Sequence, residues 1–163
     1  MIKTNADRLI TIDGLELARD KYQELGREMA ERVKALQDAR AHGDLSENAE
    51  YKSALERLEE IQIEVKEVQD VLNDHVIATT PPDTSVARFG AVISLQDQDT
   101  AEQINFRIGG KVEARYGDAF LYFKAPLPQA VIAKSIGSVI YYNEHNYKIV
   151  NLHYPDSATR SKL

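Results

Sequence analysis

The 163-residue sequence contains no cysteine, which excludes disulfide bonds, thiolate metal sites and cysteine nucleophiles. It has no run of about 18 apolar residues, the length that a membrane-spanning helix needs. The first eight residues lack a following apolar core, so we expect no signal peptide. Phosphate-binding glycine loops and nucleophile elbows are absent, and the four histidines lack metal-ligand spacing. These absences predict a cytoplasmic protein without a membrane partner.

Charge is divided unequally between the two halves of the chain. Residues 1–78 hold 11 Lys and Arg against 18 Asp and Glu, a net charge of −7, whereas residues 79–163 hold 9 against 8, a net charge of +1. An acidic segment binds nucleic acid poorly by itself, because phosphate contacts depend on cationic side chains. We therefore expect any contact with nucleic acid to be local or shared with a partner.

Two long segments of the acidic half show helical apolar spacing. In each, apolar residues recur every three or four positions and so form one stripe along a helix. The stripes comprise Leu15, Ala18, Tyr22, Leu25, Met29, Val33 and Leu36, and then Tyr51, Leu55, Leu58, Ile61, Val65, Val68 and Leu72. Asp13 and Glu16 have capping-box spacing, which predicts Asp13 as the N-cap of the first helix. Two such stripes joined by a short turn predict an antiparallel coiled coil roughly 40 Å long.

The pattern changes after residue 78. Pro81 and Pro82 stop the helix. Strand-like patterns follow at 86–95, 102–108, 119–123, 138–142 and 147–152, with a short helix at 126–134. We therefore predict an α+β protein with two domains. Its segments are an antiparallel coiled-coil hairpin at 1–78 with an acidic tip at 43–50, a linker at 79–85, an antiparallel α+β domain at 86–157 and a tail at 158–163.

Two carboxylates, Asp44 and Glu47, lie three residues apart where the hairpin turns back. The spacing alone fits a capping box, as at Asp13 and Glu16, and it also places both acids on one side of the tip. Carboxylate oxygens are the ligands that a hard cation such as Mg²⁺ prefers. Spacing therefore leaves a structural and a metal-binding interpretation open.

The amino-acid sequence of the tip resembles a known motif. The stretch Ala41-His42-Gly43-Asp44-Leu45-Ser46-Glu47-Asn48-Ala49-Glu50-Tyr51 is similar to the tip of the GreA/GreB family of bacterial transcript-cleavage factors, nearer GreA. In that family an acidic coiled-coil tip reaches the RNA polymerase active site, and a C-terminal domain with an FKBP-like fold docks on the polymerase. The resemblance covers the layout of the entire chain, and it is most specific around residues 39–52.

The resemblance implies a transcription elongation factor that enters the secondary channel of RNA polymerase and stimulates Mg²⁺-dependent cleavage of backtracked nascent RNA. Asp44 and Glu47 would be the catalytic pair and would hold Mg²⁺ jointly with the polymerase, with none bound by the free protein. The chain would then be a donor of catalytic groups and not an independent enzyme. It would act as a monomer on the 3′ end of the nascent RNA within the complex.

Other side chains near the acids are candidates for positioning RNA or the active site. These are Ser46, Asn48, Arg40 and Lys52. Each has a structural alternative, because polar groups solvate helix starts and cations balance charge on an acidic coil. Tyr51 is expected to pack at the distal end of the coil.

The C-terminal domain departs from the family pattern at two places. Residues 108–114 lack most of the acidity of the family's run, and Lys124-Ala125-Pro126-Leu127-Pro128 lacks its Ser-Pro. Three alternatives therefore stay open: a channel-binding regulator or inhibitor of polymerase without cleavage activity, an FKBP-like prolyl isomerase or chaperone, and an inert coiled-coil adaptor.

Overall fold

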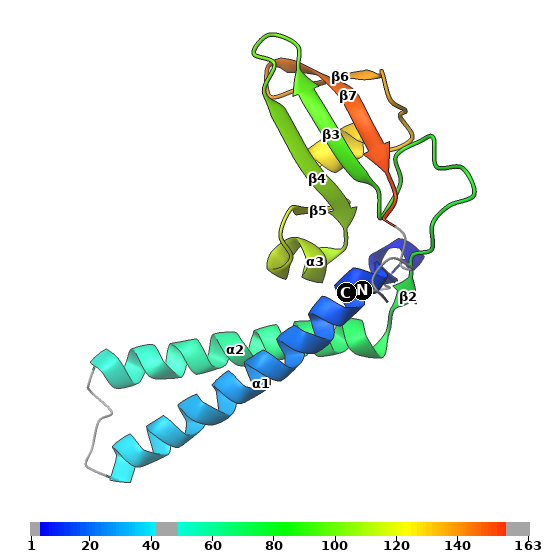
Figure 1. The fold of residues 1–163 in the computed structure, drawn as a ribbon. Helices are drawn as coiled ribbons and strands as arrows, with labels where there is room; N and C mark the ends of the chain where they lie inside the picture. Colours follow the sequence, from blue (N-terminus) through cyan, green and yellow to red (C-terminus); the bar gives the residue numbers. More distant parts are fainter. Residues whose placement is uncertain (1–3, 42–48, 156–163) are drawn as a thin grey trace, which may run out of the picture. The chain divides into compact units, whose positions relative to one another are not determined.

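The computed structural model describes residues 4–41 and 49–155 (Figure 1). Contacts divide the chain into two compact units: unit 1 contains Met1–Leu17 and His75–Leu163, and the hairpin contains Ala18–Asp74. The elements are η1 (Asn5–Arg8), β1 (Leu9–Ile10), α1 (Ile12–Ala41), α2 (Ala49–Asn73), β2 (Val76–Ile77), β3 (Val92–Asp97), β4 (Gln103–Gly109), α3 (Lys111–Tyr116), β5 (Phe120–Tyr122), α4 (Pro126–Val131), β6 (Val139–Tyr142) and β7 (His145–His153). This confirms an α+β chain with two long helices followed by a sheet-rich part. Within the described ranges, no helix combines the length and apolarity that crossing a membrane requires.

The hairpin is built from the two predicted apolar stripes. Leu25 and Leu36 of α1 and Ile61 and Val68 of α2 are buried, all at positions that the periodicity assigns to the seam. Tyr22 lies on the same stripe but stays 36 % exposed. The two helices draw apart toward the ends that residues 42–48 join (Figure 1). Packing along the seam is therefore less complete than in a regular coiled coil, where each apolar position fills a hole in the partner helix.

The N-cap of the first helix lies two residues before the predicted cap, and α1 begins at Ile12. The Thr11 hydroxyl accepts a hydrogen bond from the Gly14 main-chain N–H at 2.9 Å, and the Thr11 carbonyl accepts one from the Leu15 N–H at 2.9 Å. Thr11 therefore caps α1, and the prediction of Asp13 as the N-cap is wrong. Asp13 lies in the first helical turn and instead accepts from Arg107 Nη1 at 2.6 Å.

Unit 1 is organised around a five-stranded sheet with the order β5-β4-β3-β7-β6. Its pairs are antiparallel, except that β5 runs parallel to β4. Along β3 the side chains alternate between partly exposed and buried, and two of the buried ones, Ile93 and Leu95, form a core with α4. The predicted strand at 86–95 begins only at Val92, because Gly90 adopts a left-handed φ of +88° that interrupts an extended chain.

A buried carboxylate holds the start of the chain within unit 1. Glu113 of α3 is fully buried, and its Oε1 accepts hydrogen bonds from the Thr11 hydroxyl and from the Thr11 N–H at 3.0 Å. The Gly110 N–H donates to Oε2. These hydrogen bonds supply the partners that a buried polar side chain needs. Residues 1–17 therefore group with unit 1, whereas the sequence assigned them to the hairpin.

A second contact within unit 1 joins the N-terminal turn η1 to Lys124, and its strength should depend on pH. Lys124 donates to Asp7, and the Thr4 hydroxyl donates to the same carboxylate at 2.7 Å. These bonds, chiefly the one from Lys124, lower the pKa of Asp7 from 3.8 to about 2. Because the pKa of Asp7 is lowered in the folded protein, the contact contributes to stability above pH 3.8, and this contribution is lost as the pH falls through about 2.

We expect a ¹³C-carboxyl NMR titration to give a midpoint near 2 for Asp7, and Lys124→Gln to raise this midpoint toward 3.8. A midpoint near 3.8 in the native protein would contradict the contact.

Candidate functional site

The candidate site is the distal end of the hairpin, where α1 ends at Ala41 and α2 begins at Ala49. Four of the predicted site residues, Asp44, Ser46, Glu47 and Asn48, lie outside the described residues, so their roles stay predictions. Arg40 and Lys52 are described. Both are exposed, Arg40 on the last turn of α1 and Lys52 on the first turn of α2.

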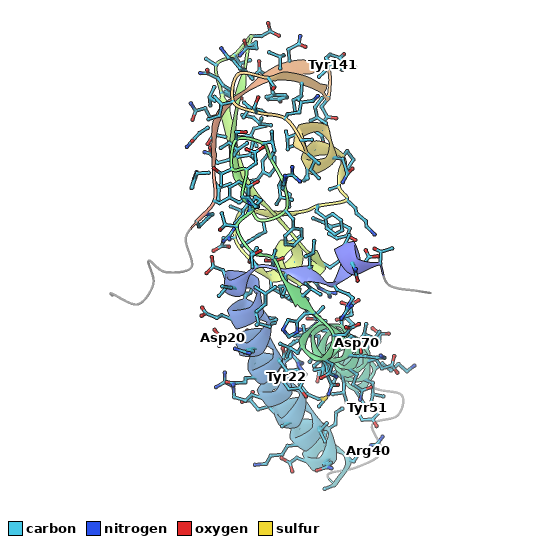
Figure 2. All side chains as sticks on the ribbon, turned by 90° about the vertical axis from the view of Figure 1, so that its right-hand side faces the viewer. Asp20, Tyr22, Arg40, Tyr51, Asp70 and Tyr141 are labelled. Atoms are coloured by element: carbon cyan, nitrogen blue, oxygen red, sulfur yellow. The ribbon has the colours of Figure 1, made fainter. Side chains whose placement is uncertain are left out.

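The structure joins Arg40 to Tyr51 across the two helix ends. Arg40 Nε donates a hydrogen bond to the Tyr51 hydroxyl at 2.6 Å, and Arg40 Cζ lies 5.5 Å from the centre of the Tyr51 ring. Figure 2 shows both residues at the same end of the hairpin. Tyr51 is half-buried, in agreement with its predicted packing at the distal end. The pairing was not visible in the sequence, because no rule of spacing connects two helices that are joined by a turn of unknown geometry.

A cavity of about 180 Å³ lies between the helices next to this pair. Its lining residues are Arg32, Ala35, Leu36, Ala39, Glu50, Tyr51 and Ala54. Three of them are alanines, whose short side chains leave space where a regular coiled coil has larger apolar groups. The distal end of the hairpin is therefore packed less tightly than the part around Ile61 and Val68.

An ion cluster joins the helices farther from the tip. Glu28 of α1 accepts from Arg57 of α2 at 3.3 Å and from Arg32 at 3.0 Å. Arg57 also contacts two acids of its own helix, Glu60 at 3.1 Å and Glu64 at 3.2 Å. The hydrogen bond from Arg32, with the positive charge of Arg57 nearby, lowers the pKa of Glu28. The cluster helps to keep the two acidic helices together.

One group of metal-ligand type occurs among the described residues, and it belongs to unit 1. Asp97, Asp99 and His145 offer ligand atoms within 4.8 Å of one another. The Asp97 carboxylate already accepts from the main-chain N–H groups of Asp99 and Thr100, at 2.8 and 3.1 Å, and lies 2.7 Å from His145 Nδ1. These bonds lower the pKa of Asp97, chiefly through Asp99. The arrangement is that of a turn closed by the Asp97 carboxylate with a histidine side chain beside it, so we assign no metal to it.

Comparison with known proteins assigns both parts of the chain to one family. The profile described as "Transcription elongation factor, N-terminal" matches residues 8–77, and the profile "Transcription elongation factor, GreA/GreB, C-term" matches residues 82–154. The chain belongs to the GreA/GreB family of transcription elongation factors. This confirms the predicted resemblance to the family, and the chain is nearer to GreA than to GreB. The candidate site therefore lies at the end of the hairpin in a GreA-type protein.

Two GreA proteins support the same assignment. Transcription elongation factor GreA of Caulobacter vibrioides strain NA1000 is 38 % identical over 112 residues, which cover 68 % of this chain and 71 % of that protein. GreA of Paracoccus denitrificans is 31 % identical over 156 residues, which cover 88 % of this chain and 99 % of that protein. A solved structure of the transcription factor Gfh1 aligns with a TM-score of 0.47 at 18 % identity, over 94 % of this chain and 99 % of that one.

Proposed function

We propose that this GreA-type factor binds RNA polymerase through its secondary channel and stimulates Mg²⁺-dependent cleavage of backtracked nascent RNA, which releases arrested complexes. One observation carries the proposal: the tip motif around Asp44 and Glu47 occurs in a chain of this family, in the sequence between two long helices. We propose that the factor works in the cytoplasm. We also propose that it is a monomer, because the two apolar stripes of its hairpin pair with each other and need no second chain.

The donor chemistry of the tip suits the proposed metal. Two carboxylates supply hard oxygen ligands, and they leave most of the octahedral shell of Mg²⁺ to other donors. When bound, such an ion activates a water molecule and stabilises the leaving oxygen in phosphodiester hydrolysis. Asp44 and Glu47 would bind it together with acids of the polymerase, so the free protein has no activity of its own and binds no Mg²⁺ firmly.

The test uses a stalled, backtracked polymerase complex with an end-labelled transcript. We expect the protein to accelerate release of the 3′ RNA fragment in the presence of Mg²⁺, and added nucleotides then to extend the shortened transcript. The protein incubated with the same RNA but without polymerase should release nothing.

Binding to polymerase without cleavage would favour a different function. The departures at residues 108–114 and 124–128, which lie in the C-terminal part of the chain, make a channel-binding regulator the second candidate. Pull-down of polymerase by the protein, combined with no change in RNA release, would select the regulator. Prolyl isomerase activity of the whole protein on a proline peptide would instead favour the FKBP-like alternative.

A further inference from the structure

We propose that Tyr51 is a positioning residue, whose hydroxyl accepts a hydrogen bond from Arg40 that closes the distal end of the hairpin and fixes the two helix ends between which the acidic tip is connected. The functional consequence rests on the proposed cleavage activity. The closure itself concerns the free protein and can be measured without polymerase.

The location of the pair makes it suitable for this role. Arg40 is one residue from the end of α1, and Tyr51 is the third residue of α2. A direct bond of 2.6 Å between them restrains the separation of the points where residues 42–48 leave one helix and enter the next. A hydrogen bond from a charged donor is shorter and stronger than one between neutral groups. The bond therefore acts close to both helix ends, so a change in the spacing of these ends would change the separation of the points that residues 42–48 connect.

Apolar packing contributes little to closure at this end. The 180 Å³ cavity next to the pair is lined by Ala35, Ala39 and Ala54, which do not reach across it. The ion pair of Glu28 with Arg57 joins the helices 12 residues earlier on α1, about 18 Å away at 1.5 Å per residue. Beyond Leu36, the separation of the helices therefore depends more on polar contacts such as the Arg40 bond than on a filled seam.

The hydrogen bond to Tyr51 also restrains the orientation of the Arg40 side chain. With Nε bound to Tyr51, the plane of the guanidinium group is held, and its two terminal nitrogens keep donors of their own. If Arg40 contributed to cleavage through its charge alone, its contribution would survive loss of the Tyr51 hydroxyl. If Arg40 and Tyr51 act by holding the helix ends in place, their contribution would be lost with that hydroxyl. This difference makes the inference testable.

The experiment compares Tyr51→Phe with Tyr22→Phe, which removes the same hydroxyl from a tyrosine on α1 that is 36 % exposed. The first readout is amide hydrogen exchange in the free protein. We expect Tyr51→Phe to speed exchange about 3- to 10-fold at residues 37–41 and 50–55, the range for loss of one net hydrogen bond, with no change near Ile61. Tyr22→Phe should leave exchange at both helix ends unchanged.

The second readout is RNA cleavage as a function of factor concentration. We expect Tyr51→Phe to lower the maximal cleavage rate about 3- to 10-fold without changing the concentration that gives half of it, because the tip is displaced and docking is not. Arg40→Lys keeps the charge but loses Nε, so it should have a similar effect. The double variant should be no worse than either single variant.

Several outcomes would overturn the inference. Unchanged exchange in Tyr51→Phe would mean that the bond does not close the hairpin. Faster exchange with native cleavage, or additive effects of Tyr51→Phe and Arg40→Lys, would remove the positioning role. If the native protein itself fails to cleave, the proposed function fails first and the positioning role fails with it, even where exchange shows the closure.

Discussion

The variant Asp44→Asn/Glu47→Gln should lose RNA cleavage by about 10²- to 10³-fold, since metal-ion catalysis stabilises the transition state by several kcal/mol and each 1.36 kcal/mol is a factor of ten. Both amides keep the size of the acids and remove only the charge that a cation needs. Because the acids belong to the tip segment, and we propose that the C-terminal domain docks on the polymerase, we expect the affinity for polymerase to change little. Cleavage and binding assays on the same stalled complex measure the two effects separately.

A matched control separates the acids of the tip from the general acidity of the hairpin. Glu31 and Glu59 are exposed on α1 and α2, and Glu31→Gln/Glu59→Gln changes the net charge by the same two units. This control should cleave at the native rate. Native cleavage by the tip variant would remove Asp44 and Glu47 from the mechanism, whereas equal losses in both variants would point to the total charge of the hairpin.

The substitutions Gly14→Ala and Gly26→Ala should change stability in opposite directions, although both glycines belong to α1. A Cβ on Gly14 would overlap the carboxyl end of Glu113, which is fully buried and cannot move aside. Overpacking of this kind costs about 1–3 kcal/mol. A Cβ on Gly26 meets no described atom within 4 Å, so the better helix propensity of alanine should stabilise the protein by about 0.5–1 kcal/mol.

Urea unfolding monitored by circular dichroism measures both changes. The comparison is internal, because the two variants differ only in the position of one methyl group on the same helix. Glu113→Ala is itself destabilising, because Glu113 accepts hydrogen bonds from Thr11 and Gly110. In a Glu113→Ala background, however, Gly14→Ala should cost less stability than in the native protein, since the smaller side chain removes the overlap. A stabilised Gly14→Ala protein would show that Glu113 does not occupy the place next to Gly14.

Long repeated patterns explain which parts of the fold are predictable. The stripe from Leu15 to Leu36 repeats over six turns, so an error at one position does not change the assignment of α1. The helix start was predicted wrongly because Asp13 and Thr11 both suit an N-cap, and the choice depends on Arg107 and Glu113, which are distant in sequence. Local propensity contains no information on such partners.

Short elements and buried charges were harder to predict for related reasons. The six residues of α3 make fewer than two turns and show no clear stripe, so the pattern predicted no helix there. Glu113 would normally be assigned to the surface, since an acidic side chain is rarely fully buried. Nor does the sequence show that β5 lies parallel to β4, because strand direction depends on the connection through α3.

At the candidate site the sequence predicted residues but not the contacts between them. Arg40 was predicted as a cation for RNA and Tyr51 as a packing residue, and the structure adds that they bond to each other. That bond depends on how the two helices approach, which the spacing within each helix does not determine. The roles of Asp44, Glu47, Ser46, Asn48 and Lys52 remain predictions for the experiments above.

The parallel pairing of β1 with β2 has a topological consequence. Leu9 lies opposite Val76 and Ile10 opposite Ile77, so two segments far apart along the chain belong to one small sheet within unit 1. In the language of chain topology, residues 18–74 are an insertion into a discontinuous domain. The length of such an inserted arm can evolve by whole helical turns while the strand pairs and the core of the host domain stay the same.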